Sequence, residues 1–181
     1  MFHSILLLLL RRINSLIFRI IVLCKGGFIP LNCTIDILSL RSIFVGHGFR
    51  LGSNSRISVS HGAKLLLGSY VTTGHNFTLY CTLFVSIGDH CRIAHGVTIV
   101  DSKYLNPLAS PRLYNQTESQ PIIINSNTLI YTGAIVLLGV TIPHNSTVAS
   151  YAIVHSGLDL KLPGLIFGSR SPDEFRPYIS S

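Results

Sequence analysis

The sequence of 181 residues predicts an all-β solenoid, in which short parallel strands wind into a three-sided prism of about five coils. Two observations carry this prediction. Aliphatic residues recur every six positions, and small residues stand two positions before most of them. A period of six fits neither an α-helix nor the two-residue alternation of an ordinary strand. Three sides of six residues each, however, complete one coil of a prism.

The six-residue register is clearest near the C-terminus and recurs upstream. Fourteen of its fifteen positions are aliphatic, so we expect them to point into the prism. These positions are Val45, Leu51, Ile57, Leu65, Val71, Phe77, Ile87, Ile93, Ile99, Ile124, Ile130, Val136, Ile142, Val148 and Val154. They group into coils at 45–62, 65–82, 87–104, 124–141 and 142–159. The small residues two positions earlier are expected where the chain turns a corner.

One long interruption separates Ile99 from Ile124, and it contains the stretch DSKYLNPLASPR. We interpret residues 100–121 as an insertion looped out of the prism. The predicted organisation is therefore an N-terminal segment at 1–40, the solenoid at 41–160 and a C-terminal tail at 161–181.

Residues 5–24 predict an amphipathic helix, with Arg11, Arg12 and Arg19 spaced to share one face. The longest uninterrupted apolar run is six residues, far short of the ~20 that span a bilayer. Two roles stay open. The helix could cap the first coil, or it could lie on the inner membrane with its leucines buried and its arginines against anionic head groups.

The basic charge is concentrated at the N-terminus. Residues 1–56 hold seven cations against Asp36, which gives +6 of the net charge of +7. This distribution does not indicate a nucleic-acid partner. The four cysteines have no C-x-x-C spacing and no zinc pattern, so we expect free thiols and no metal site. With no convincing secretory signal, the expected location is the cytoplasm, with peripheral contact to the inner membrane as an open addition.

Two runs carry a family resemblance: IGDHCRIAHGVTIVDS at 87–102 and PIIINSNTLIYTGAIVLLGVTIPHNSTVASYAIV at 121–154. They resemble the hexapeptide-repeat acyltransferases, which are left-handed parallel β-helices, and most of all the O-acetyltransferases of lipopolysaccharide and capsule sugars. The resemblance implies a homotrimer with active sites between neighbouring prisms. It also implies acetyl-CoA as the acyl donor along the coil flank, and an insertion that covers a sugar or lipid-linked saccharide.

Acetyl transfer to a hydroxyl requires a base and a thioester held within reach. Relatives use a histidine in an H-P-L context on the insertion, whereas this chain has Asn106 in NPL, and asparagine cannot accept the proton. His95 and His75 are the candidate bases, although His75 could equally be a buried corner residue and His95 a solvated one. Three interpretations stay open: a histidine base, transfer by orientation alone, or a catalytically silent trimer that serves as a binding or scaffold protein.

The resemblance also places binding residues. The family element N-F-x-x-N is represented by NFTLY, in which Asn76 matches and Tyr80 replaces the second asparagine, which suggests Asn76 and Tyr80 at the acceptor. Asp101 and Tyr104 on the insertion could contact it too, or could be an ordinary turn acid and a packing aromatic. The donor is expected near Thr132, Ser150, His155 and Ser156, with its phosphates near the cations Lys161, Arg170 and Arg176, each of which could instead be solvated surface.

Overall fold

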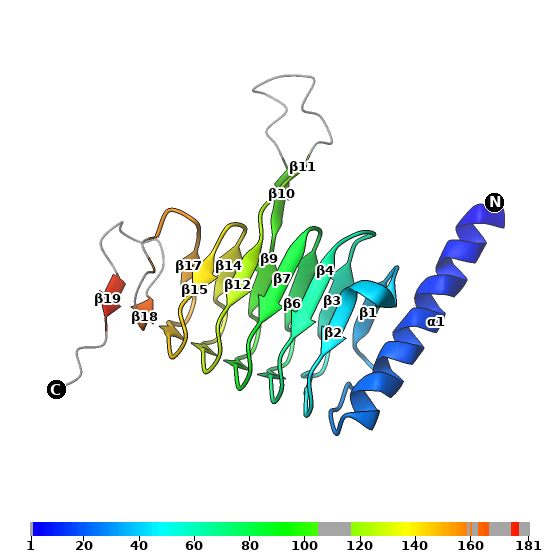
Figure 1. The fold of residues 1–181 in the computed structure, drawn as a ribbon, viewed down its shortest axis with the longest axis horizontal. Helices are drawn as coiled ribbons and strands as arrows, with labels where there is room; N and C mark the ends of the chain where they lie inside the picture. Colours follow the sequence, from blue (N-terminus) through cyan, green and yellow to red (C-terminus); the bar gives the residue numbers. More distant parts are fainter. Residues whose placement is uncertain (1, 105–116, 159, 161–162, 167–174, 178–181) are drawn as a thin grey trace, which may run out of the picture.

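The chain forms a β-solenoid of about five coils with one helix at its N-terminal end (Figure 1). The computed structural model describes residues 2–104, 117–158, 160, 163–166 and 175–177. The helix α1 spans Phe2–Cys24, and a short 3-10 turn, η1, spans Leu40–Ser42. The solenoid predicted from the six-residue period is thus confirmed.

Three sheets form the sides of the prism within the described residues. Sheet A contains β5 (Thr72–Thr73), β8 (Arg92–Ile93), β13 (Leu129–Ile130), β16 (Thr147–Val148), β18 (Gly164–Ile166) and β19 (Phe175–Pro177). Sheet B contains β1 (Thr34–Ile37), β3 (Arg56–Val59), β6 (Thr78–Cys81), β9 (Thr98–Val100), β14 (Ile135–Leu137) and β17 (Ile153–Val154). Sheet C contains β2 (Ile43–Val45), β4 (Lys64–Leu67), β7 (Phe84–Ile87), β12 (Ile122–Ile124) and β15 (Thr141–Ile142). Neighbouring strands are parallel except for the β18–β19 pair.

All fifteen register residues are buried, with at most 3% of their surface exposed. Ile130 pairs with Ile93 on one side and Val148 on the other, which is the vertical stacking that the period predicts. The prism interior is therefore a column of aliphatic side chains, and its burial is the main source of stability.

In one coil, the predicted inward positions lie two residues before the residues that actually stack. Leu67, Thr73 and Leu79, rather than Leu65, Val71 and Phe77, occupy the stacked positions. The cause is coil length: Arg50 pairs with Thr72, so this coil takes 22 residues (72 − 50) instead of three sixes. The displaced residues are still buried, two positions before the stacked ones, where the sequence predicted mostly small side chains.

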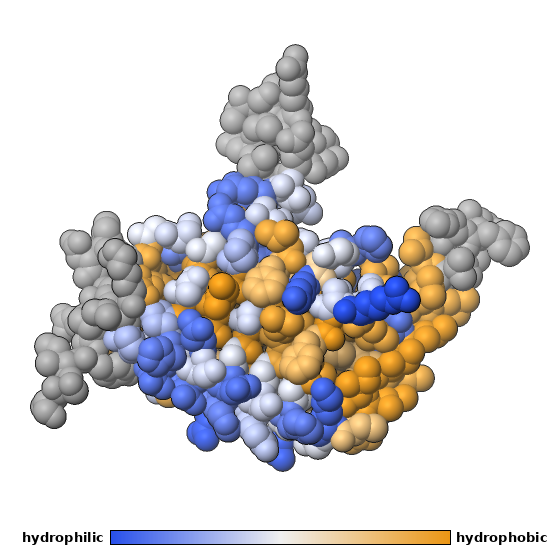
Figure 2. Space-filling view, viewed as in Figure 1, coloured by the Kyte–Doolittle hydropathy of each residue, from blue (hydrophilic) through white to orange (hydrophobic). Residues whose placement is uncertain are grey.

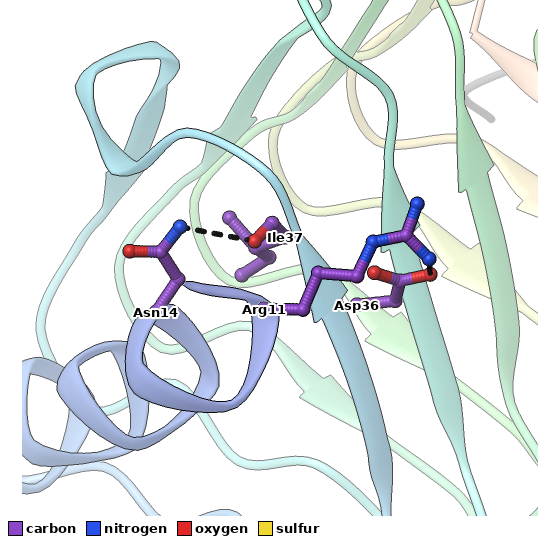
Figure 3. Close-up of polar contacts among 4 residues, drawn as sticks. All are labelled: Arg11, Asn14, Asp36 and Ile37. Carbon is purple, nitrogen blue, oxygen red and sulfur yellow. Dashed lines mark hydrogen bonds and ion pairs between the residues drawn. The ribbon is translucent and has the colours of Figure 1, made fainter. Parts of the chain in front are cut away.

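The helix α1 lies across the N-terminal end of the prism (Figure 1). Phe18 and Val22 are buried against the first coil. Arg11 pairs with Asp36 at 3.2 Å, and the Asn14 amide donates to the carbonyl oxygen of Ile37 at 3.2 Å (Figure 3). The helix therefore covers the end of the solenoid, as one of the two predicted roles requires.

Two expectations about this segment need correction. The first coil begins at Phe28, which forms a parallel bridge with Arg50, so the boundary predicted at residue 41 moves to about residue 28. The membrane alternative also expected all three arginines against anionic head groups, and two of them instead bind within the chain. Arg11 points to β1, and Arg19 donates to the carbonyl oxygens of Ile29, Pro30 and Cys33, while Arg12 is exposed.

From residue 7 onward the outward side of α1 is mainly apolar, and Figure 2 shows this hydrophobic surface along the N-terminal end, at the right of the view. In the part of the chain that the structure describes, no helix has the length and apolar content needed to cross a membrane.

The predicted insertion begins as an antiparallel hairpin that projects from the side of the prism (Figure 1). Its strands are β10 (Ser102–Tyr104) and β11 (Thr117–Ser119). Residues 105–116, which include Asn106, lie outside the described residues.

Candidate functional site

Four of the predicted site residues lie on one corner of the prism, where the chain turns from sheet A to sheet B. His75, His95, Thr132 and Ser150 occupy this corner on successive coils, and we call them the histidine edge. The backbone connects them, because Gly96 N–H donates to the His75 carbonyl at 2.9 Å and Gly133 N–H donates to that of His95 at 2.9 Å. Adjacent coils are ~4.8 Å apart, so the four residues form a continuous strip.

The two histidines of this edge form a ladder. Their rings stack with centroids 5.1 Å apart and planes 17° apart. Backbone N–H of Ser53 donates to Nδ1 of His75, and N–H of His75 donates to Nδ1 of His95, both at 3.0 Å. Both side chains are exposed, so the expectation that His75 could be a buried corner residue is wrong.

This ladder fixes what each imidazole can do. Because Nδ1 accepts a hydrogen bond, a neutral ring carries its proton on Nε2. The atom that faces solvent is thus a donor, suited to a carbonyl oxygen or an oxyanion. To accept a proton at Nε2, the ring would first have to change tautomer and give up its backbone hydrogen bond.

Asp101, at the base of the hairpin, is completely buried. Its Oδ1 accepts from the N–H and the hydroxyl of Thr82, at 2.8 and 2.7 Å. Its Oδ2 accepts from the N–H groups of Leu83 and Phe84, at 2.8 and 2.9 Å. We therefore replace the predicted acceptor contact of Asp101 with a structural role: its carboxylate ties the root of the insertion to the previous coil.

A groove of about 520 Å³ lies beside the hairpin and contains two of the predicted acceptor residues, Tyr80 and Tyr104. The Tyr104 side chain is 80% exposed and stands on the hairpin itself. Lys103 and Glu118 form an ion pair of 3.1 Å across the hairpin, and hydrogen bonds from Lys103 and then Gln120 lower the pKa of Glu118. Asn76 does not line this groove, because it lies in the turn directly after His75, where its φ of 57° is positive.

A second hollow, of about 480 Å³, lies on the C-terminal coils and includes two predicted donor residues, His155 and Ser156. His144 also lines it and was not among the predicted site residues. His144 is an exposed residue at a corner, one coil after Ser126, so its place two positions after the register residue Ile142 could have indicated it. Thr132 and Ser150 lie on a different corner and do not line this hollow.

A third hollow, of about 700 Å³ on the outer surface of sheet A, was not predicted. Arg50, Thr72 and Arg92 line it in one column, next to the stacked rings of Tyr70 and His90. Two exposed cations with a hydroxyl between them suit an anionic group. Of the predicted phosphate-binding cations, Lys161 and Arg170 lie outside the described residues, and of Arg176 only the backbone, on β19, is described.

The histidine edge and the hairpin groove lie on opposite edges of sheet B. His75 precedes β6 of this sheet, whereas the hairpin leaves the prism after β9, at the far ends of the strands. A four-residue strand such as β6 is ~13 Å long. Within a single chain, the histidine edge, where the donor is expected, is therefore separated from the hairpin groove, where the acceptor is expected.

No family model matches the sequence, and no curated protein matches it. Solved structures do match. A variant of AntD, an N-acyltransferase from Bacillus cereus, in complex with dTDP and coenzyme A, superimposes with a TM-score of 0.62 at 19% identity, covering 79% of this chain and 82% of its own. A second AntD variant, in complex with dTDP-4-amino-4,6-dideoxyglucose and coenzyme A, gives 0.61 at 18% identity, over 78% and 76%.

A hexapeptide-repeat acetyltransferase from Vibrio cholerae, VCA0836, complexed with acetyl coenzyme A, gives a TM-score of 0.50 at 18% identity, over 71% of this chain and 57% of its own. The solenoid, the six-residue stacking and these superpositions agree. This chain has the fold of the hexapeptide-repeat acyltransferases.

Proposed function

We propose that this chain is an acyltransferase that moves an acetyl group from acetyl-CoA to a hydroxyl of a sugar in a bacterial surface polysaccharide, in the cytoplasm. The observation that carries the proposal is the histidine edge on a fold whose similar structures hold coenzyme A or acetyl coenzyme A. The family resemblance of the sequence supports the sugar hydroxyl, in lipopolysaccharide or capsule synthesis, as the acceptor.

In the proposed reaction, the sugar oxygen attacks the thioester carbonyl carbon. The C–S bond breaks, a C–O ester bond forms, and the hydroxyl proton ends on the sulfur of CoA. The Nε2–H of His95 points outward and donates to the carbonyl oxygen as negative charge develops there. One such donor contributes about 100- to 1,000-fold in rate. Orientation of the two reactants supplies the rest of the acceleration that this site offers.

The working unit of this proposal is a homotrimer with the site between neighbours. The support is geometric, because the histidine edge and the hairpin groove of one chain lie on opposite edges of sheet B. A closed ring of copies sets the hairpin of one chain against the histidine edge of the next. The acceptor then sits under Tyr104 of one copy, and the donor lies along the edge that ends at Ser150 of its neighbour.

A catalytically silent scaffold is the second candidate, and a specific observation favours it. Both Nδ1 atoms of the histidine ladder are occupied by backbone N–H groups, and Asn106 stands where relatives carry their base. Such a chain would still assemble and could bind sugar or donor without turning it over.

The first experiment measures binding of acetyl-CoA by calorimetry, and then release of free CoA thiol in the presence of sugar nucleotides and polysaccharide fragments. Binding with acceptor-dependent thiol release supports the enzyme. Binding without release supports the silent protein, and the absence of binding refutes the donor assignment.

Two variants then separate the chemical roles of His95. His95→Gln keeps an N–H near the position of Nε2 but cannot act as a base, whereas His95→Ala removes both functions. If His95 is a donor, the glutamine variant keeps most of the turnover that the alanine variant loses. Equal loss in both variants would contradict the donor role and favour a base.

A further inference from the structure

The helix α1 has two sides with opposite characters. The side toward the prism carries the polar contacts: Arg11 to Asp36, Asn14 to the carbonyl oxygens of Ile37 and Leu38, and Arg19 to the loop at 29–33. From residue 7 to the end of the helix, Arg11, Asn14 and Arg19 thus make their contacts within the chain, whereas Arg12 is exposed on the flank. Phe18 and Val22 are also buried on this side, so α1 packs inward through two apolar side chains as well as these polar contacts, and its remaining large aliphatic residues are left on the other side.

The side away from the prism is a stripe of large aliphatic residues, which we call the outer face of α1. Its members recur at helical spacing and are half or more exposed: Leu9 (51%), Ile13 (53%), Leu16 (60%), Ile20 (50%) and Leu23 (66%). Leu10, Ile17 and Ile21 widen the stripe on one flank. Exposed apolar surface this continuous marks a binding site rather than ordinary surface, because a soluble monomer rarely leaves it uncovered.

The apolar surface continues beyond the helix at the same end of the prism. Leu31 is 92% exposed in the loop whose carbonyl groups bind Arg19, so it lies beside α1. Phe28 and Phe44, on the first coil, are also more than half exposed. Figure 2 shows this hydrophobic surface extending from α1 onto the neighbouring coils.

The charges around this end are positive. Arg12, Arg41, Arg50 and Arg56 have exposed side chains on α1 and the first coils. Up to residue 56 the sequence has one acidic residue, Asp36, and Arg11 already pairs with it. An apolar face at an end of the prism that carries exposed cations is complementary to a lipid leaflet with anionic head groups. It is not complementary to a second copy of itself, which would bring like charges together.

We propose that the outer face of α1 docks the end of the prism on an anionic lipid surface. The leucines and isoleucines enter the head-group boundary, and the arginines around them contact lipid phosphates. The histidine edge and the hairpin run along the sides of the prism, so they stay clear of the lipid. This proposal rests on the helix and not on the proposed function.

The test is co-sedimentation of the full chain with vesicles of phosphatidylcholine alone or mixed with phosphatidylglycerol. We expect binding to the mixed vesicles that weakens with salt. The triple variant Leu16→Ser, Ile20→Ser and Leu23→Ser should bind at least about tenfold more weakly, because it removes three large aliphatic side chains from the interface. The matched control makes the same change at exposed apolar residues on other coils, Leu83, Tyr131 and Ile153, and should bind as the parent does.

A fluorophore gives a second readout at a native position. All four cysteines are described, and Cys24 at the end of α1 is exposed while Cys33, Cys81 and Cys91 are buried. An environment-sensitive label on Cys24 should shift to the blue on mixed vesicles. Failure of the parent chain to bind either vesicle overturns the proposal, as does undiminished binding by the triple variant. Self-association that the triple variant abolishes, without vesicle binding, would assign the face to a second copy and also overturn it.

Discussion

Replacing Asp101 with asparagine tests whether this carboxylate holds the insertion to the solenoid. The change is nearly isosteric, so it alters charge and hydrogen bonding without opening a cavity. The carboxylate accepts four hydrogen bonds, two on each oxygen, and has no exposed surface. Every donor is therefore satisfied only while both oxygens are acceptors.

The expected cost follows from counting these partners. The amide NH₂ is best placed at Oδ1, where the Thr82 hydroxyl can turn and accept from it. The N–H of Thr82 is then left without an acceptor, at a cost of about 1–3 kcal/mol. The bonds from Leu83 and Phe84 lose their charge assistance, at about 1 kcal/mol each. Together the free energy of unfolding should fall by about 3–5 kcal/mol.

Urea denaturation followed by circular dichroism measures this change, and the melting temperature should fall by about 6–20 °C for a chain of this size. The control is Glu118→Gln on the same hairpin, because Glu118 is only half-buried and its ion pair with Lys103 lies at the surface, so its loss should change stability only slightly. A loss below about 1 kcal/mol in Asp101→Asn would refute the structural role and reopen Asp101 as an acceptor contact.

Three further predictions address the coils, the helix and the interior thiol. Gly74→Ala should destabilise the chain by about 1–3 kcal/mol in urea, because its Cβ would lie 2.6 Å from the backbone N of His95. Gly96→Ala, where the Cβ meets open space but φ is +67°, should cost only about 1 kcal/mol. Arg19→Ala removes the side-chain donor of three carbonyl groups, one of which, that of Pro30, keeps the N–H of Cys33. It should cost about 2 kcal/mol, with faster proteolysis of α1, and unchanged proteolysis would contradict the capping contacts. Burial, and then Asp101, raise the pKa of the Cys81 thiol from 9.0 to about 12, so its contribution to stability is complete below pH 9 and is lost as the pH rises toward 12. The stability difference between the parent and Cys81→Ala should therefore shrink between about pH 8 and about pH 10.5, and a constant difference would contradict the raised pKa.

The solenoid and its core could be predicted from the sequence because each coil repeats one local rule. A residue that must face the interior, such as Ile130 or Val148, has to be aliphatic wherever the chain completes another six-residue side. The position of the insertion can be predicted in the same way, because the six-residue spacing of aliphatic residues is interrupted there. The register of Leu67, Thr73 and Leu79 did not follow, because coil length depends on which strands pair and not on the spacing along the chain.

Only part of the histidine edge could be predicted from the sequence. His75 and His95 could be selected as candidate site residues, but their ladder could not, since it joins backbone and ring atoms of different coils. The opposite positions of this edge and the hairpin groove also emerged only from the sheet arrangement. That separation is the reason why the proposed site needs two copies of the chain.

The sequence by itself determined that α1 is a helix with three arginines among leucines, and that Asp101 is an acid at a turn. Only the tertiary structure decided where these charges point. The open end of a solenoid exposes carbonyl groups that no further strand satisfies, and Arg19 and Asn14 turn inward to meet them. Likewise the N–H groups of the preceding coil converge on Asp101. The residue pattern does not show which backbone groups lack a partner. The need to pair these groups orients the polar side chains of α1 inward, and this leaves its aliphatic residues on the outer face.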